Sequence, residues 1–319
     1  MKILMIGGSG FVARALRSAL QLHRTEKDPE LLIASRNAPA LQEGEGFVHW
    51  DATTPSTLRP VFDFIIHLAT PASAEMNIHK PAEMLEANIL TMKNIIDFAA
   101  KHPNPPRLLF TSSGAVYGNV SAVPNGIPED FPTPEAGQSH FSDSAYAEGK
   151  RVAESLLTES TLKGQCLGLI ARLFAFSGPS LPRDRHFAIG NFVRDAVQQQ
   201  KIVVRSSGQS IRSYLDETDM AEWLIGILKS GGPLDIFHVG SERAISIRSL
   251  AELVASRYTA ITSIHSDVEI LGLSSPLDGV DFYVPSTDYT RKKLSLTEKV
   301  SLENSIDSML YAALQNSEV

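Results

Sequence analysis

The chain has 319 residues, of which 43% are hydrophobic and 20% are charged, so it is long enough for one large or two ordinary globular domains. Its formal net charge of -7 argues against nucleic acid as the main partner, because binding a phosphate backbone needs a basic surface. The single cysteine, Cys166, excludes an internal disulfide and a cysteine-based zinc site. No apolar run is long enough for a signal peptide core or a membrane span, so we expect a cytoplasmic protein that does not enter a membrane.

An N-terminal segment, KILMIGGSGFVARAL, joins a short apolar run to a glycine-rich loop and then to an amphipathic pattern. Gly7, Gly10 and Ala13 have the spacing G-x-x-G-x-x-A. In such a loop the backbone can approach a diphosphate, and the N–H groups at the start of the helix, here at Phe11 and Val12, bind the anion. A tight turn whose glycines only supply unusual φ angles is the alternative. Because the motif follows a strand and opens a helix, we interpret it as a dinucleotide-binding loop.

Strand-like apolar runs alternate with helical patterns through the first half of the chain. The runs cover 2–6, 31–35, 63–69, 107–113 and 166–173, and the later helical patterns cover about 82–100 and 145–158. This alternation predicts an α/β fold with a doubly wound parallel (Rossmann) sheet. The predicted dinucleotide-binding domain covers 1–173, and 213–239 returns to it. The predicted substrate lobe is smaller, has mixed α/β structure, and covers 174–212 and 240–319.

The second predicted strand ends at Ser35 and Arg36, with no Asp or Glu between Leu31 and Leu41. NAD-specific sites usually place a carboxylate here to bind the ribose 2′-OH. A hydroxyl and a guanidinium suit a 2′-phosphate instead, so NADP(H) is predicted over NAD, with a solvated arginine as the alternative. Further along, Asp51 follows another apolar segment and is a candidate to accept from the adenine amino group, with a turn-forming Asp as the close alternative.

The segment HLATPAS (67–73) runs from a strand into small residues, the composition needed where backbone lies against a cofactor. Leu68, Ala69 and Thr70 are therefore candidate cofactor contacts. His67 is interpreted as a packed or hydrogen-bonded structural residue rather than a catalytic one.

The chemistry is predicted at the strand that ends in TSSGAVYG and at the helix that carries SDSAYAEGK. Tyr146 and Lys150 are four residues apart, hence on one helix face. A neighbouring ammonium should lower the pKa of the phenol, so that Tyr146 exchanges a proton with a substrate oxygen near neutral pH. Ser113 could hydrogen-bond the same oxygen. A bare Tyr-x-x-x-Lys pair occurs often by chance, and the tyrosine could be core, but the order of the motifs supports the catalytic interpretation.

The ordered set of motifs resembles the extended short-chain dehydrogenase/reductase family, and within it the nucleotide-sugar epimerases, dehydratases and reductases. The motifs are Gly7/Gly10/Ala13, HLAT, EANILTMKNI, TSSGAVYG, Tyr146/Lys150 and FHVGSERAISIRSLA, and they cover nearly the whole chain.

This resemblance implies that Ser113, Tyr146 and Lys150 form the catalytic triad and that Lys150 also binds the nicotinamide ribose. It further implies that Asn88 lies behind the active site, that Arg212 contacts a substrate diphosphate, and that the chain forms a homodimer. Against these roles, Arg212 could be an ordinary surface arginine. Arg205 is a further candidate for substrate binding.

The chain departs from the family pattern beside the active-site serine and in a later substrate-contacting motif. In the 4,6-dehydratases an Asp-Glu pair follows the active-site Ser/Thr, whereas Gly114 and Ala115 stand here, so dehydration is not expected. In the family's Arg-x-x-Asn-x-Tyr-Gly-Pro motif, Ala175 replaces the substrate-contacting Asn. His186 and Asn191 are candidates to compensate for that loss.

The leading hypothesis is an NADPH-dependent reductase of a nucleotide-diphosphate keto-sugar, such as a 4-keto-6-deoxyhexose. The alternative is a nucleotide-sugar epimerase that keeps its NAD(P) tightly bound and returns the hydride to the other face. Two further hypotheses are a reductase of a small carbonyl compound and a catalytically inactive protein that senses NADP.

Overall fold

The computed structural model describes residues 2–22, 30–70, 74–121, 123–134, 141–185, 187–198, 201–272 and 281–315. Its centre is a sheet of seven parallel strands. In spatial order these are β11 (Ile236–Val239), β6 (Leu167–Leu173), β5 (Arg107–Ser113), β4 (Phe64–His67), β1 (Lys2–Ile6), β2 (Glu30–Ser35) and β3 (Glu45–His49). The order reverses direction at β1, which confirms the predicted doubly wound Rossmann sheet.

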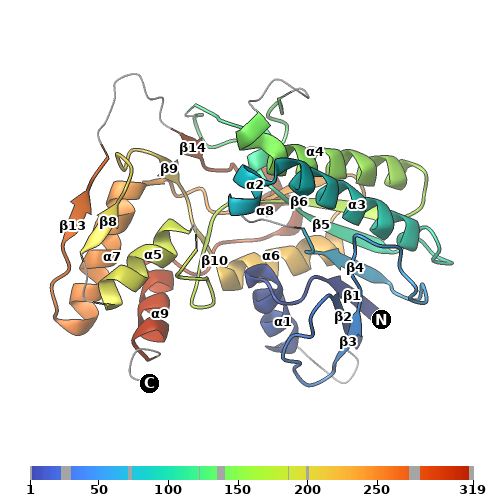
Figure 1. Cartoon of the computed structure of the whole chain (residues 1–319), viewed down its shortest axis with the longest axis horizontal. Coiled ribbons are helices and arrows are strands. Elements are labelled where there is room, and N and C mark those ends of the chain that lie inside the picture. Colours follow the sequence, from blue (N-terminus) through green and yellow to red (C-terminus); the bar gives the residue numbers. More distant parts are fainter. Residues whose placement is uncertain are drawn as a thin grey trace.

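Helices cover both faces of the sheet (Figure 1). One face carries α1 (Phe11–Leu22) and α6 (Glu217–Ser230), and the other carries α3 (Pro81–Ala99) and α4 (Phe141–Leu162). The remaining helical elements near the sheet are short, namely α2 (Ala74–His79), the 3₁₀ turn η1 (Gly114–Tyr117) and α8 (Asp288–Leu294). None of the described helices is long and apolar enough to cross a membrane.

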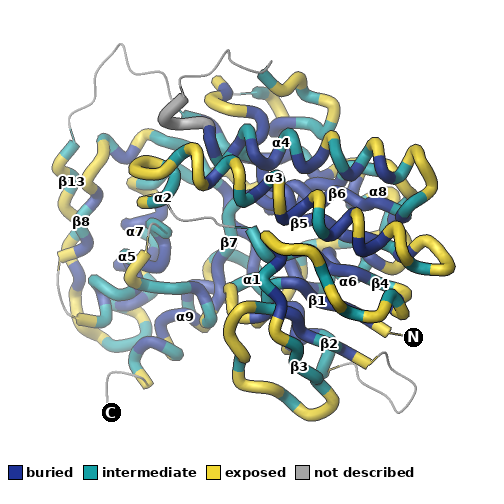
Figure 2. Tube along the Cα trace, turned by 45° about the vertical axis from the view of Figure 1, so that its right-hand side comes forward, coloured by how far each residue is buried: buried dark blue, intermediate teal, exposed yellow. Residues whose placement is uncertain are grey.

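Strand β1 illustrates why the sheet is buried on both sides. Its side chains alternate, so Ile3 and Met5 join the core under α1 and α6, while Leu4 and Ile6 join the core under α3 and α4. Figure 2 shows the same division, with the inner helix faces buried and the outer faces exposed. A strand flanked by two cores needs apolar residues throughout, which is the pattern that the sequence carries.

A second group of elements forms a smaller lobe with its own core. It contains α5 (Ala188–Val197), α7 (Ile247–Thr262), α9 (Leu302–Gln315), β8 (Ile202–Val204) and β13 (Val268–Ile270). The segment 213–239 contributes α6 and β11 to the large sheet and its helices. The assignment of one part to the cofactor and the other to the substrate stays a prediction.

Short strands connect this lobe to the large sheet. β7 (Phe176–Ser177) pairs with β10 (Leu215–Asp216), and β9 (Ile211–Arg212) lies between β12 (Ile245–Ser246) and β14 (Phe282–Tyr283). A small apolar cluster joins β14 to η1, through residues that include Val116, Tyr117, Phe282 and Val284. Consequently β14 lies beside the end of β5, and the smaller lobe meets the carboxyl edge of the sheet, where ligands bind in this architecture.

Candidate active site

The glycine loop between β1 and α1 has the geometry of an anion-binding turn. Gly7 has a φ of +93°, and a Cβ there would lie 2.9 Å from the backbone nitrogen of Ala69, so the close approach of β1 and β4 needs glycine. At Gly10, by contrast, a Cβ would meet no atom within 4 Å. The start of α1, at Phe11 and Val12, therefore opens onto free space that can accept the phosphates of a dinucleotide.

A buried arginine, which the sequence analysis did not identify, holds this loop through an ion pair and a hydrogen bond. Arg17, on α1, forms an ion pair with Glu45 (2.6 Å) and donates to the carbonyl oxygen of Gly8 (3.2 Å). Both side chains of the pair are almost fully buried. The pair thus holds the glycine loop, α1 and the start of β3 together.

The end of β2 carries the residues predicted to select the cofactor. The Ser35 hydroxyl donates to the carbonyl oxygen of Asn37 (2.7 Å), and the Arg36 side chain is exposed. Asp51 accepts from the hydroxyl and the backbone N–H of Thr53 (2.8 and 3.0 Å), and these two hydrogen bonds lower its pKa, with a smaller effect from the charge of Arg36. Asp51 therefore forms a turn, as the structural alternative expected, and its contact with adenine stays a prediction.

The end of β4 brings backbone and a hydroxyl to the same edge. Leu68 donates to Ile6 and Thr70 donates to Leu68, both through backbone N–H groups (2.8 and 3.0 Å). His67 is fully buried, its ring stacks on Phe110 with centroids 5.1 Å apart, and burial holds its pKa well below the ordinary value. A neutral, enclosed imidazole agrees with a structural role for His67.

The three predicted catalytic residues meet at the carboxyl end of β5. Tyr146, on α4, lies close enough to Ser113 for the serine hydroxyl to act on its pKa. One turn further along α4, the buried Lys150 ammonium donates to Thr70 Oγ1 (2.6 Å) and to the carbonyl oxygen of Thr111 (2.7 Å), and lies 5.5 Å from the Tyr146 ring centre. Asn88, on α3, is buried against this stretch of α4, because a Cβ at Gly149 would lie 2.8 Å from its side chain.

The pKa shifts of Tyr146 and Lys150 correct the expectation that the lysine makes the phenol more acidic. Burial raises the pKa of Tyr146, and only its hydrogen bond with Ser113 opposes the rise. Burial also lowers the pKa of Lys150 to about 7, against the opposing charge of Glu154. The prediction that Lys150 lowers the pKa of Tyr146 was wrong for this ligand-free state, because removing both groups from water outweighs their mutual attraction.

The position that carries an acid in the dehydratases is sterically closed. A Cβ at Gly114 would lie 2.7 Å from the ring of Phe174. Neither Gly114 nor Ala115 supplies an acid or base beside Ser113. That this chain does not dehydrate a sugar stays a prediction.

The predicted substrate residues are not all brought to this edge. Arg212 is ion-paired with Asp281, and its guanidinium lies 5.7 Å from the ring centre of Tyr283, which itself reaches Ser113. Asn191 accepts from Arg194 on α5 (3.4 Å), and Arg205 is exposed after β8. Within the described residues, neither Asn191 nor Arg205 shares a hydrogen bond or ion pair with the catalytic group, and His186 lies outside them.

Tyr283 is the residue of this group that sequence reasoning missed. The segment DFYVP resembles any short apolar strand, and its approach to Ser113 depends on how the smaller lobe folds back.

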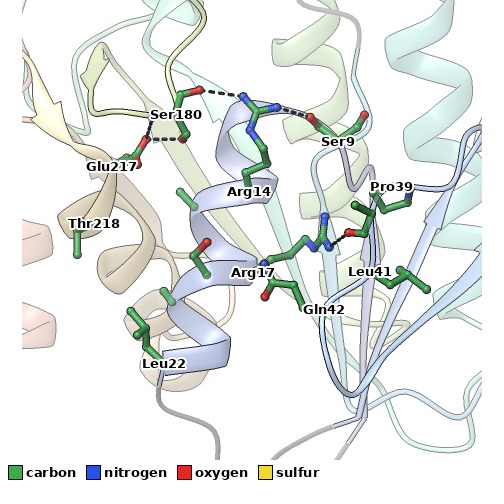
Figure 3. A pocket seen from close by; sticks show the side chains of 14 residues that line it. Ser9, Arg14, Arg17, Leu22, Pro39, Leu41, Gln42, Ser180, Glu217 and Thr218 are labelled. Carbon is green, nitrogen blue, oxygen red and sulfur yellow. Dashed lines mark hydrogen bonds between the residues drawn. The ribbon is translucent and has the colours of Figure 1, made fainter. Parts of the chain in front are cut away.

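A cavity of about 570 Å³ lies on the outer side of α1 (Figure 3). In it Arg14 donates to the carbonyl oxygens of Ser9 (2.8 Å) and Ser180 (2.9 Å), and Ser180 bonds to Glu217. None of Ser113, Tyr146 and Lys150 lines this cavity, so it is separate from the catalytic group.

Comparison with known proteins matches residues 3–240 to the model of the NAD dependent epimerase/dehydratase family. UDP-glucuronic acid decarboxylase 6 from Arabidopsis thaliana is 27% identical over 322 residues, covering 97% of this chain and 88% of the relative. Two solved structures share the fold. UDP-glucose 4-epimerase from Thermotoga maritima, with UDP-glucose, has a TM-score of 0.81 at 17% identity, and RMD from Pseudomonas aeruginosa, complexed with NADPH, has 0.80 at 22% identity. Each alignment covers 99% of this chain and 100% of the other.

Proposed function

We propose that this chain, which belongs to the NAD dependent epimerase/dehydratase family, is an NADPH-dependent reductase of a nucleotide-diphosphate keto-sugar, such as a 4-keto-6-deoxyhexose. The observation that carries this proposal is the meeting of Ser113, Tyr146 and Lys150 at the carboxyl end of β5, at a site that lacks an acid at positions 114 and 115. A reductase starts with a tyrosine that donates a proton. An epimerase or dehydrogenase starts with one that accepts a proton from a substrate hydroxyl.

The residues present fit a nicotinamide dinucleotide. The open space at Gly10 and the N–H groups at the start of α1 suit its diphosphate, and the backbone at Leu68 and Ala69 suits its nicotinamide half. The buried Lys150 ammonium, beside Thr70, suits a ribose hydroxyl. When bound, NADPH supplies the hydride that adds to the carbonyl carbon.

The protein supplies the proton and the polarisation. Tyr146 gives its phenolic proton to the substrate carbonyl oxygen as negative charge develops there, and Ser113 hydrogen-bonds the same oxygen. The positive charge of Lys150 then stabilises the phenolate that remains. Arg212 takes the substrate diphosphate in exchange for part of its contact with Asp281.

Arg36 is expected to select NADPH over NADH. A charge-assisted hydrogen bond to the 2′-phosphate is worth about 1.5–3 kcal/mol, so Arg36→Ala should weaken NADPH binding roughly 10- to 100-fold and leave NADH binding almost unchanged. Fluorescence titration of both cofactors measures this, with the exposed Arg248 on the smaller lobe, changed to Ala, as a matched control. Equal affinity of the unmutated protein for NADPH and NADH would contradict the assignment and favour the epimerase.

The epimerase is the second candidate, supported by the match of residues 3–240 to a family that includes NAD-dependent epimerases. The decarboxylase activity in the name of the Arabidopsis relative is an activity of that protein. Reduction of a small carbonyl compound and a role that only senses NADP are the weaker alternatives for this chain. An intact Ser113, Tyr146 and Lys150 group argues against a protein that only senses the cofactor.

Cofactor stoichiometry separates the two leading candidates. Nucleotide-linked 4-keto-6-deoxyhexoses are offered with NADPH, while nicotinamide absorbance and product stereochemistry are followed. We expect one NADPH oxidised for each sugar reduced, because a reductase must release oxidised cofactor at every turnover. Interconversion of two nucleotide sugars with no added cofactor and no absorbance change would identify an epimerase. Tight NADPH binding without turnover of any keto-sugar would indicate another carbonyl substrate.

A further inference from the structure

Tyr283 brings a hydroxyl from the smaller lobe into the catalytic group. Its strand, β14, pairs with β9, and its ring packs against Phe174 with centroids 4.8 Å apart. Its hydroxyl lies 3.4 Å from Ser113 Oγ and 3.3 Å from the carbonyl oxygen of Leu173. The ring also lies beneath the guanidinium of Arg212, so the tyrosine is held on several sides.

The donors and acceptors around Ser113 can be assigned, because two of the backbone groups involved can act in only one way. The backbone N–H of Ala115 can only donate, and it donates to Ser113 Oγ (3.1 Å). The carbonyl oxygen of Leu173 can only accept, so Tyr283 donates to it. The oxygen of Tyr283 is then an acceptor for the proton of Ser113.

This chain of hydrogen bonds assigns opposite roles to Ser113 with and without substrate. Without substrate, Ser113 gives its proton to Tyr283. To polarise a carbonyl oxygen, Ser113 must instead point its proton at the substrate. Tyr283 has two acceptors at nearly equal distance, Leu173 and Ser113, so its hydroxyl can turn from one to the other by rotation about a single bond.

We propose that Tyr283 is a positioning residue that holds the Ser113 hydroxyl and lets Ser113 redirect its proton from Tyr283 to a carbonyl oxygen when one binds. This inference rests on the proposed reduction for its kinetic consequence, but the hydrogen-bond chain itself exists without substrate. Tyr283 acts through Ser113 and does not exchange a proton with the sugar.

The kinetic test is a double-variant comparison. Tyr283→Phe is expected to lower kcat about tenfold, the effect of one hydrogen bond, while KM changes less than about threefold. In a Ser113→Ala background the same change should cause no further loss. Tyr258→Phe, a buried tyrosine in the core of the smaller lobe, is the matched control and should keep full activity. A full additional loss in the double variant would overturn the proposal, because Tyr283 would then act independently of Ser113.

A second readout needs no substrate and no reaction. Tyrosines are replaced throughout by 3,5-difluorotyrosine, which makes the phenol more acidic, and the ¹⁹F resonance of residue 146 is assigned with Tyr146→Phe. When the Tyr283 hydroxyl turns to donate to Ser113, Ser113 can donate to the Tyr146 phenolate as it would to a carbonyl oxygen. Tyr283→Phe removes that support and should therefore raise the titration midpoint of residue 146 by about one pH unit. An unchanged midpoint would overturn the proposal. Failure of the wild type to reduce any keto-sugar would refute the proposed function only, because this titration still decides the role of Tyr283.

Discussion

Replacing Tyr146 with phenylalanine is expected to lower the turnover of keto-sugar by at least about 100-fold, the usual size of a general acid–base contribution. The substitution removes one oxygen and leaves the ring against Lys150. Without the phenol, the developing alkoxide has Ser113 as its remaining partner in the catalytic group, and Ser113 is itself held by Tyr283. Steady-state kcat, measured by NADPH absorbance, reports the loss.

The control for this variant is cofactor binding. NADPH affinity should stay within about threefold of the wild type, because the proposed diphosphate and ribose contacts come from α1 and Lys150. Tyr289→Phe removes an exposed hydroxyl bonded to Asp235 and should leave kcat unchanged. Activity of Tyr146→Phe within about tenfold of the wild type would make Tyr146 a packing residue and would refute the mechanism.

The fold could be predicted because its signals are local. The apolar run at 107–113 is strand β5 as observed, and alternate residues of β1 enter different cores, which is what a run without polar interruptions requires. The helix predicted at 145–158 extends from Phe141 to Leu162, because its weak amphipathic pattern gives no clear ends. The placement of Ser113 against Tyr146 and Lys150 also followed from local spacing, since a strand end and one helix face are both short-range features.

The rest of the site depends on contacts that spacing cannot encode. Tyr283 reaches Ser113 only because β14 returns from the smaller lobe and pairs with β9. The pKa of Tyr146 was predicted with the wrong sign, because helix spacing predicts its distance from Lys150 but not the loss of water around both groups. Desolvation is a property of the whole packed site, and it dominates here because Lys150 is buried and Tyr146 is half-buried beside it.

Lys150→Met is expected to lower kcat by at least about 100-fold and to stabilise the ligand-free protein near neutral pH. The catalytic loss follows because the variant lacks the charge that stabilises the Tyr146 phenolate and the proposed ribose contact. The gain in stability follows because a buried lysine whose pKa falls to about 7 is unfavourable as an ammonium. Loss of the donor to Thr70 and Thr111 offsets part of this gain at every pH.

The pH dependence of the stability difference between wild type and Lys150→Met separates the cost of the buried charge from the loss of hydrogen bonds, which does not change with pH. In the unfolded chain Lys150 titrates near its ordinary pKa of 10.5, and in the folded chain near 7, so the unfolded state binds more protons between these values. The cost of Lys150 is therefore complete below about pH 7, shrinks as the pH rises, and vanishes above about pH 10.5. Urea unfolding of wild type and Lys150→Met should give a free-energy difference that changes by about 2 kcal/mol, in favour of the wild type, between about pH 7.5 and 9.5. Lys229→Met, at an exposed position on α6, should show no such slope. A flat difference for Lys150→Met would mean that this ammonium keeps its ordinary pKa in the folded protein, and the assignment of a buried, desolvated lysine beside Tyr146 would have to be abandoned.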